Sequence, residues 1–80
     1  MDIKIYGLGC DKCAALEKLV REVAARKAPD AKVELINDIL ELMKLGTLAA
    51  PAVVIDGVMK SSGRVPGRGE IEDWLQPAAA

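Results

Sequence analysis

The spacing of apolar residues divides the first part of the chain into two strands with a long helix between them. Apolar and polar residues alternate at 2–6 and at 32–36, which is the pattern of a half-buried strand. Residues 11–27 instead repeat their apolar side chains at helical spacing. The stripe that this helix is expected to bury consists of Cys13, Leu16, Val20, Val23 and Ala24, with Leu19 at its edge.

A shorter helix is predicted after the second strand. Asn37 or Asp38 is a suitable N-cap for it, and Gly46 is placed for its C-terminal cap. We expect this helix to bury an apolar stripe that includes a core methionine. The stripe consists of Ile39, Leu42 and Met43.

The last part of the chain predicts a hairpin and a terminal helix. Residues 52–55 are apolar on both faces, as in a buried strand, and Asp56-Gly57 is a strong signal for a two-residue hairpin turn. The partner strand is expected at 58–61, followed by a loop over 62–69. The terminal helix at 70–75 is expected to bury Ile71, Trp74 and Leu75.

These elements predict one α/β domain with the order βαβαββα. A helical crossover makes the strands at 2–6 and 32–36 parallel, and the hairpin adds an antiparallel pair. We therefore expect a mixed four-stranded sheet with helices on both faces. The single domain is expected to cover residues 1–80, with its core over 2–76 and a flexible tail at 77–80.

Composition narrows the possible functions. The net charge of -1 gives no electrostatic reason to expect nucleic acid or a membrane as a partner. The apolar runs are far shorter than the ~20 residues of a membrane span, and no leader pattern is visible, so we expect a cytoplasmic protein. The chain has no histidine, which removes Cys/His dyads and the usual zinc sites that contain histidine, and we expect no metal.

The two cysteines of the chain, Cys10 and Cys13, lie between the first strand and the long helix. If the helix starts at Cys10, its unpaired N–H groups and its macrodipole favour a thiolate there. Residues three apart share a helix face, so Cys13 lies within disulfide reach of Cys10. The pair therefore predicts a nucleophile, Cys10, and a resolving thiol, Cys13.

Four neighbouring residues are expected to shape this site. Gly9 allows a close backbone turn before the first cysteine. Tyr6 is expected to pack either above the thiols, which we favour, or in the core. Asp11 repels a thiolate at Cys10 whereas Lys12 attracts it, so the sign of their combined effect on the redox potential stays open.

The order of these features resembles the thioredoxin/glutaredoxin superfamily, and most of all its small redox proteins from bacteria and archaea. The resemblance covers residues 2–76 and rests on Tyr6-Gly7-x-Gly9-Cys10-x-x-Cys13, Ala50-Pro51, Val54-x-Asp56-Gly57 and Gly63-Arg64-Val65-Pro66. It implies a minimal thioredoxin-like fold. It also implies that a cis bond precedes Pro51, that this proline packs beside the cysteines, and that Ala50 offers its backbone to an extended substrate segment.

The resulting functional hypothesis is a thiol–disulfide oxidoreductase. Cys10 attacks a disulfide of a protein or small-molecule substrate, Cys13 resolves the mixed disulfide, and a disulfide reductase resets the pair. The Cys10–Cys13 disulfide is then the only redox group, and no other cofactor is expected. A monomer is the default expectation. The sequence leaves open the physiological substrate and reductase, the redox potential and direction, and the dependence on glutathione.

Two other functions fit the same cysteines. Two thiolates after a glycine-containing turn also resemble the soft-metal chaperones of the heavy-metal-associated family, which bind Cu(I). Those domains end in a strand, whereas this chain is predicted to end in a helix, so the order of elements favours the redox hypothesis. A scaffold without redox activity is the third alternative.

Overall fold

Four strands and three helices make up the part of the chain that the structure describes. The structure is a computed structural model, and it describes residues 1–9, 11–46 and 49–75. The elements are β1 (Asp2–Tyr6), α1 (Asp11–Lys27), β2 (Lys32–Ile36), α2 (Ile39–Lys44), β3 (Ala52–Ile55), β4 (Val58–Ser62) and α3 (Arg68–Leu75). The order βαβαββα predicted from the sequence is confirmed. The tail expected at 77–80 lies outside the described residues.

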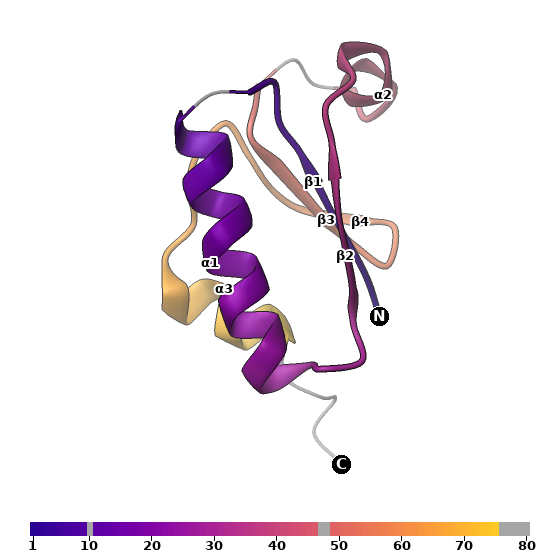
Figure 1. Cartoon of the computed structure of the whole chain (residues 1–80). Helices are drawn as coiled ribbons and strands as arrows, with labels where there is room; N and C mark the ends of the chain where they lie inside the picture. The colour runs from indigo at the N-terminus through magenta and orange to yellow at the C-terminus, as the bar shows by residue number, and fades with distance from the viewer. Residues whose placement is uncertain (10, 47–48, 76–80) are drawn as a thin grey trace.

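The strands form one mixed sheet in the order β2-β1-β3-β4 (Figure 1). β1 is parallel to β2, because α1 carries the chain back to the starting end of the sheet before β2 begins. β1 and β3 are antiparallel, as are β3 and β4. The β3–β4 turn is the predicted Asp56-Gly57 pair, whose φ angles of 50° and 84° are those that a tight hairpin turn requires.

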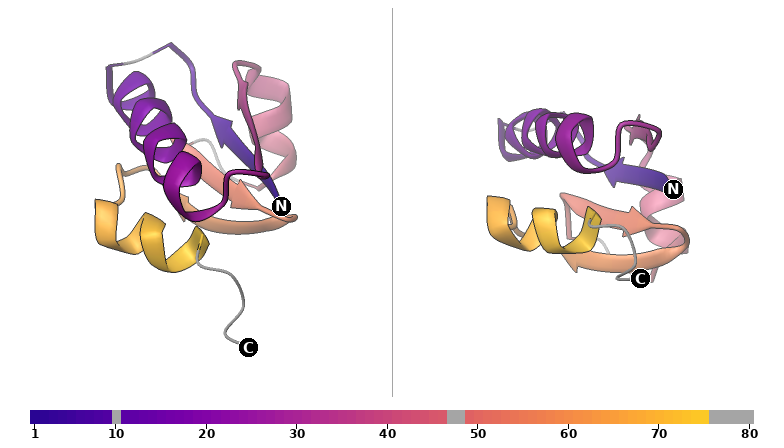
Figure 2. Two further views of the ribbon diagram at one scale, coloured as in Figure 1. Left: turned by 60° about the horizontal axis from the view of Figure 1, so that its bottom comes forward. Right: turned by 90° about the horizontal axis from the view of Figure 1, so that it is seen from below.

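The helices cover both faces of the sheet. Figures 1 and 2 show α1 and α3 on one side of it and α2 on the other. The core between the sheet and the helices α1 and α3 is formed by Ile3, Ile5, Leu16, Val20, Val23, Ala24, Val53, Ile55, Ile71 and Leu75. A smaller cluster under α2 is formed by Tyr6, Leu42, Ala52 and Val54. The buried stripe of α1 is therefore the predicted one.

The predicted burial of α2 is wrong for two of its three apolar residues. Leu42 is fully buried, but Ile39 is 50% exposed and Met43 is 52% exposed. The reason is length, because α2 has six residues and its one buried side chain fills the contact with the sheet. The cap of this helix was predicted correctly, since the Asp38 carboxylate accepts a hydrogen bond from the Leu40 N–H at 2.9 Å.

The terminal helix α3 begins at Arg68, two residues before the predicted start. Its first turn is capped by Glu70, whose carboxylate accepts a hydrogen bond from the Gly67 N–H at 2.9 Å. The Gly67 carbonyl in turn accepts from the Ile71 N–H, so the pair forms one half of a capping box. Trp74, which was predicted in the core, is only partly buried and packs against the edge of the cluster beneath α1.

Candidate functional site

Three segments meet at one end of the sheet. β1 ends there, α1 begins there, and the segment that leads into β3 returns there (Figure 1). The predicted cysteine motif lies between the first two segments, and the predicted proline directly precedes β3. Of the predicted site residues, Cys10 lies outside the described part of the chain.

Gly7 is the point where the end of β1 contacts the start of α1. Its N–H donates a hydrogen bond to the Ile36 carbonyl at 3.0 Å, which extends the β1–β2 ladder by one residue. A Cβ atom added to Gly7 would lie 2.7 Å from the Cys13 Cβ and 3.0 Å from its Sγ. The first distance is too short for real atoms and the second is unusually tight, so Cys13 occupies the space that a side chain at position 7 would need.

Cys13 lies in the first turn of α1 and is 3% exposed. It is disulfide-bonded, and the described residues contain no free cysteine. Asp11 and Lys12 precede it in the same turn, and both are exposed. The described part of the motif thus has one buried sulfur at the N-terminal end of a 17-residue helix, with two charged side chains in solvent.

The segment that leads into β3 is held by the end of β4. The Ala50–Pro51 peptide bond is cis, and the Pro51 ring is fully buried. The Pro51 carbonyl accepts a hydrogen bond from the Gly63 N–H at 2.9 Å, and the Ala49 carbonyl accepts one from the Ser62 hydroxyl at 3.0 Å. These two contacts fix the backbone on either side of Ala50.

The register of the sheet relates this segment to the cysteine. Tyr6 of β1 is paired with Ala52 of β3. Continuing that antiparallel register by one residue places Pro51 opposite Gly7. Because Gly7 also packs against Cys13, the extended register places the proline and the cysteine on either side of Gly7 at the end of β1.

Tyr6 lies in the core, which was the second of its two expected positions, and the favoured position above the thiols is wrong. Its ring is 6% exposed and packs with Leu42, Ala52 and Val54 beneath α2. The reason is the alternation of side chains along β1, because Ile5 and Gly7 face α1 and Tyr6 between them faces the opposite side. Gly9 has a φ of 80° and is exposed, as expected for a turn residue.

A small cavity of about 120 Å³ borders Cys13 on the side of β2. Leu35, Asn37 and Glu17 contribute to its lining. Glu17 was not among the predicted site residues, although it stands four positions after Cys13 and so shares its helix face. Its carboxylate accepts a hydrogen bond from Arg21 Nε at 3.0 Å. The spacing was visible in the sequence, but a charged residue on a solvated helix face gave no reason to select it.

The described residues were also compared with the requirements of a metal site and of a membrane-spanning helix. Within residues 1–9, 11–46 and 49–75, no group of three or more Cys, Asp or Glu side chains is arranged to hold a metal ion. No helix in these ranges combines the length and apolar character needed to cross a bilayer.

Comparison with known proteins gives one consistent result. The family model of the thioredoxin domain matches residues 1–76. A thioredoxin from Methanothermobacter thermautotrophicus is 39% identical over 75 residues, which cover 94% of this chain and 97% of the relative. A thioredoxin from Methanocaldococcus jannaschii is 28% identical over 74 residues, covering 92% of this chain and 85% of the relative. The alternative of a soft-metal chaperone finds no support in these matches.

Proposed function

The chain belongs to the thioredoxin family, and we propose that it is a thiol–disulfide oxidoreductase whose reactive groups are Cys10 and Cys13. The observation that carries the proposal is the position of Cys13. It is a buried, disulfide-bonded sulfur in the first turn of α1, and it is packed against Gly7. The chain contains one other cysteine, Cys10, three residues earlier.

In the proposed reaction the Cys10 thiolate attacks one sulfur of a substrate disulfide. A mixed disulfide forms, and the first substrate thiolate leaves and takes up a proton. Cys13 then loses its proton and attacks the Cys10 sulfur, which releases the second substrate thiolate. Two electrons have passed to the substrate, and the Cys10–Cys13 disulfide is left for a disulfide reductase to reduce. No other cofactor takes part.

The described surroundings of Cys13 suit this sequence of steps. The helix N-terminus favours the thiolate that has to attack. Burial of Cys13 keeps the resolving thiol away from other substrates, while its position next to the mixed disulfide gives it a high effective concentration. We further infer that an extended substrate segment lies along the Ala50 backbone, which the contacts of Ala49 and Pro51 with β4 hold in place.

The substrates we infer are disulfides of proteins or small molecules, and the partner that completes the cycle is a reductase. A cytoplasmic location fits this role, because that compartment keeps thiols reduced and makes a close cysteine pair more useful as a catalyst than as a permanent cross-link. The direction of electron flow that we propose is therefore towards the substrate.

Two single-cysteine variants test the proposal. Cys10→Ser should lose insulin disulfide reduction completely and form no adduct with substrate. Cys13→Ser should also lose turnover, but it should accumulate a one-to-one mixed disulfide with substrate that mass spectrometry detects and dithiothreitol releases. Turnover by Cys10→Ser, or an adduct on Cys13 in that variant, would show that the roles of the two sulfurs are assigned wrongly.

A further inference from the structure

β2 is the outer strand of the sheet, and its free edge is open. The strand order places no described strand beyond it, and none of its five residues is buried. Its neighbour β1, by contrast, buries three of its five. The other outer strand, β4, has an irregular register at Val53/Val54, and such bulges disfavour edge pairing. The β2 edge has no such protection, because its register with β1 is regular over all five residues.

The backbone groups that β2 presents outward can be assigned from two hydrogen bonds. The Lys32 N–H donates to the Met1 carbonyl, and the Ile36 carbonyl accepts from the Gly7 N–H, so residues 32, 34 and 36 direct their backbone groups towards β1. The intervening Val33 and Leu35 must therefore direct their N–H and C=O groups to the outside. A strand that adds to this edge would pair with those two residues.

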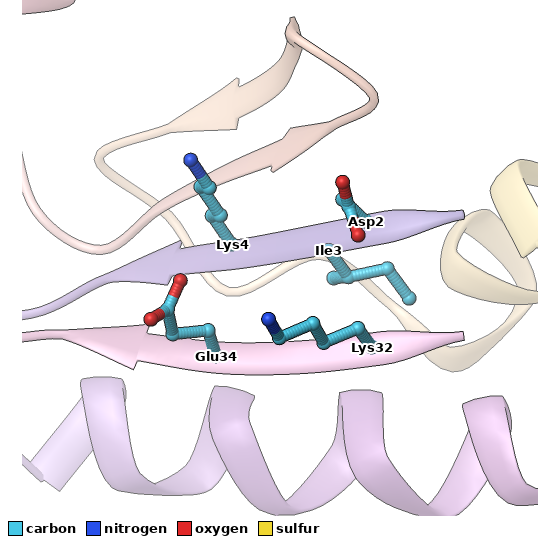
Figure 3. A pocket seen from close by; sticks show the side chains of 5 residues that line it. All are labelled: Asp2, Ile3, Lys4, Lys32 and Glu34. Atoms are coloured by element: carbon cyan, nitrogen blue, oxygen red, sulfur yellow. The ribbon is translucent and has the colours of Figure 1, made fainter. Parts of the chain in front are cut away.

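Charged side chains form two rows on one face of β1 and β2. Asp2 is paired with Lys32, and Lys4 is paired with Glu34. Figure 3 shows all four side chains on the same face of the two strands, and they line a hollow of about 190 Å³ there. Each row thus consists of one cation beside one carboxylate. The residue of each row that lies on β2, Lys32 or Glu34, is at the open edge of the sheet.

From this arrangement we propose that two copies of the chain associate through antiparallel pairing of their β2 strands, centred on Val33. In this register Val33 pairs with the partner's Val33, and Lys32 stands opposite the partner's Glu34, twice by symmetry. The charge rows then continue across four strands with alternating sign. One of them runs through Lys4, Glu34, the partner's Lys32 and the partner's Asp2.

The neighbouring registers are disfavoured by the same charges. The outward groups of Val33 and Leu35 allow only shifts that keep odd-numbered residues opposite one another. If the partner strand is shifted by two residues in one direction, Lys32 stands opposite the partner's Lys32. If it is shifted by two residues in the other direction, Glu34 stands opposite the partner's Glu34. Like charges directly opposite each other destabilise a strand pair. The sequence of β2 therefore complements itself best in the register centred on Val33.

The apolar side of the edge fits the same register. Leu35 is 41% exposed, and in this pairing it stands opposite the partner's Ala31. Beside Ala31 is a hollow of about 210 Å³, lined mainly by small residues of α1 and the turn after it together with Val33. Each Leu35 would enter the hollow of the other copy and be withdrawn from water.

The two α1 helices would lie side by side on the same face of the joined sheet. α1 contacts β1 and β2 equally, so it lies over the space between them. The two copies of α1 would then be two strand spacings apart, or roughly 10 Å, which is about the 8–10 Å of helices in direct contact. The interface consists of one strand pair and its flanks, so we expect a reversible dimer rather than a permanent one.

Charge reversal on β2 tests the proposal. The association of the full chain is measured by sedimentation equilibrium over a concentration series. A reductant is present to exclude intermolecular disulfides. The wild type should shift from one chain of 8.5 kDa towards twice that mass. Lys32→Glu alone and Glu34→Lys alone should each weaken association at least about tenfold, because each places like charges opposite one another. An equimolar mixture of the two variants restores both opposite-charge contacts and should associate at least as well as the wild type.

Lys60→Glu on β4 is the matched control, since it makes the same change of charge on the other outer strand. It should leave the association unchanged. Amide exchange of Val33 and Leu35 in the wild type should slow as concentration rises. A wild type that stays monomeric into the millimolar range overturns the proposal, as does a mixture of the two β2 variants that does not associate. Loss of association in Lys60→Glu would assign the interface to β4 and overturn it as well.

Discussion

Replacing Gly7 with alanine tests the packing at the end of β1. The backbone at Gly7 is not in the left-handed region, so alanine is conformationally allowed and even restricts the unfolded chain, which favours folding by about 0.4–1 kcal/mol. Against this stands a Cβ that would lie 2.7 Å from the Cys13 Cβ and 3.0 Å from its Sγ. Overpacking of this kind costs about 1–3 kcal/mol.

The neighbouring atoms have little freedom to relieve that contact. Cys13 is 3% exposed, and α1 is held against the sheet by Leu16 and Val20, which are fully buried. Gly7 is held in turn by its hydrogen bond to Ile36. The net effect expected for Gly7→Ala is a loss of about 1–2 kcal/mol in the free energy of unfolding, or roughly 5–15 °C in Tm for a chain of this size.

The assay is urea unfolding of the oxidised protein, with Gly69→Ala as the control. Gly69 lies in α3, and a Cβ there would meet nothing within 4 Å. Alanine should therefore stabilise the protein at position 69, by up to about 1 kcal/mol, through its helix propensity. If Gly7→Ala unfolds at the same urea concentration as the wild type, the close contact with Cys13 is not what the structure requires of position 7, and the reasoning fails.

Three further predictions concern polar groups outside that contact. The pKa of Glu70 is lowered to about 2, first by the hydrogen bond from Arg64 and then by one from a backbone N–H. Because the folded-state pKa lies below the ordinary value of 4.5, the stabilisation is present above that pH and is lost as pH falls towards 2. Acid unfolding of Glu70→Gln should lack this part of the pH dependence, and an unchanged profile would contradict the role of the pair. The buried Ser61 hydroxyl has no hydrogen-bond partner among the described residues. Ser61→Ala should therefore raise the free energy of unfolding, measured by urea denaturation, by about 1 kcal/mol. A loss of stability would mean that the hydroxyl does have a hydrogen-bond partner. Glu17→Gln removes a carboxylate from the cavity beside Cys13. The loss of this negative charge should stabilise a thiolate in the reduced form and make the midpoint potential less negative in a glutathione titration, whereas a more negative potential would refute this.

Where the sequence predicted structure correctly, the signal was local. The stripe of α1 repeats over 17 residues, and a pattern of that length leaves one face to bury. The Asp56-Gly57 turn was equally clear, because both residues adopt the positive φ angles that their types tolerate best. Neither inference depended on knowing what packs against the element.

Where the prediction from the sequence was wrong, the structure of the element was decided by a contact with another part of the chain. Ile39 and Met43 have the spacing of a buried stripe, but the sheet offers α2 space for Leu42 alone. The early start of α3 depends on Glu70, which Arg64 holds through two hydrogen bonds of 2.8 and 2.9 Å. A glycine three residues before a glutamate is a weak capping signal, so the sequence alone favoured a loop there.

The alternation of β1 explains both the proposed redox site and the open charged face. Ile3, Ile5 and Gly7 form the row that faces α1, and the row ends in the position without a side chain, where Cys13 fits. Asp2, Lys4 and Tyr6 form the opposite row. Tyr6 is covered by α2, but that helix is too short to reach the charged end, so Asp2 and Lys4 stay in solvent beside β2. A longer α2 would remove these charges from water, which costs desolvation free energy. The short helix therefore leaves this end of the sheet exposed to solvent, and it leaves β2 with the charge pattern that a second β2 strand can match.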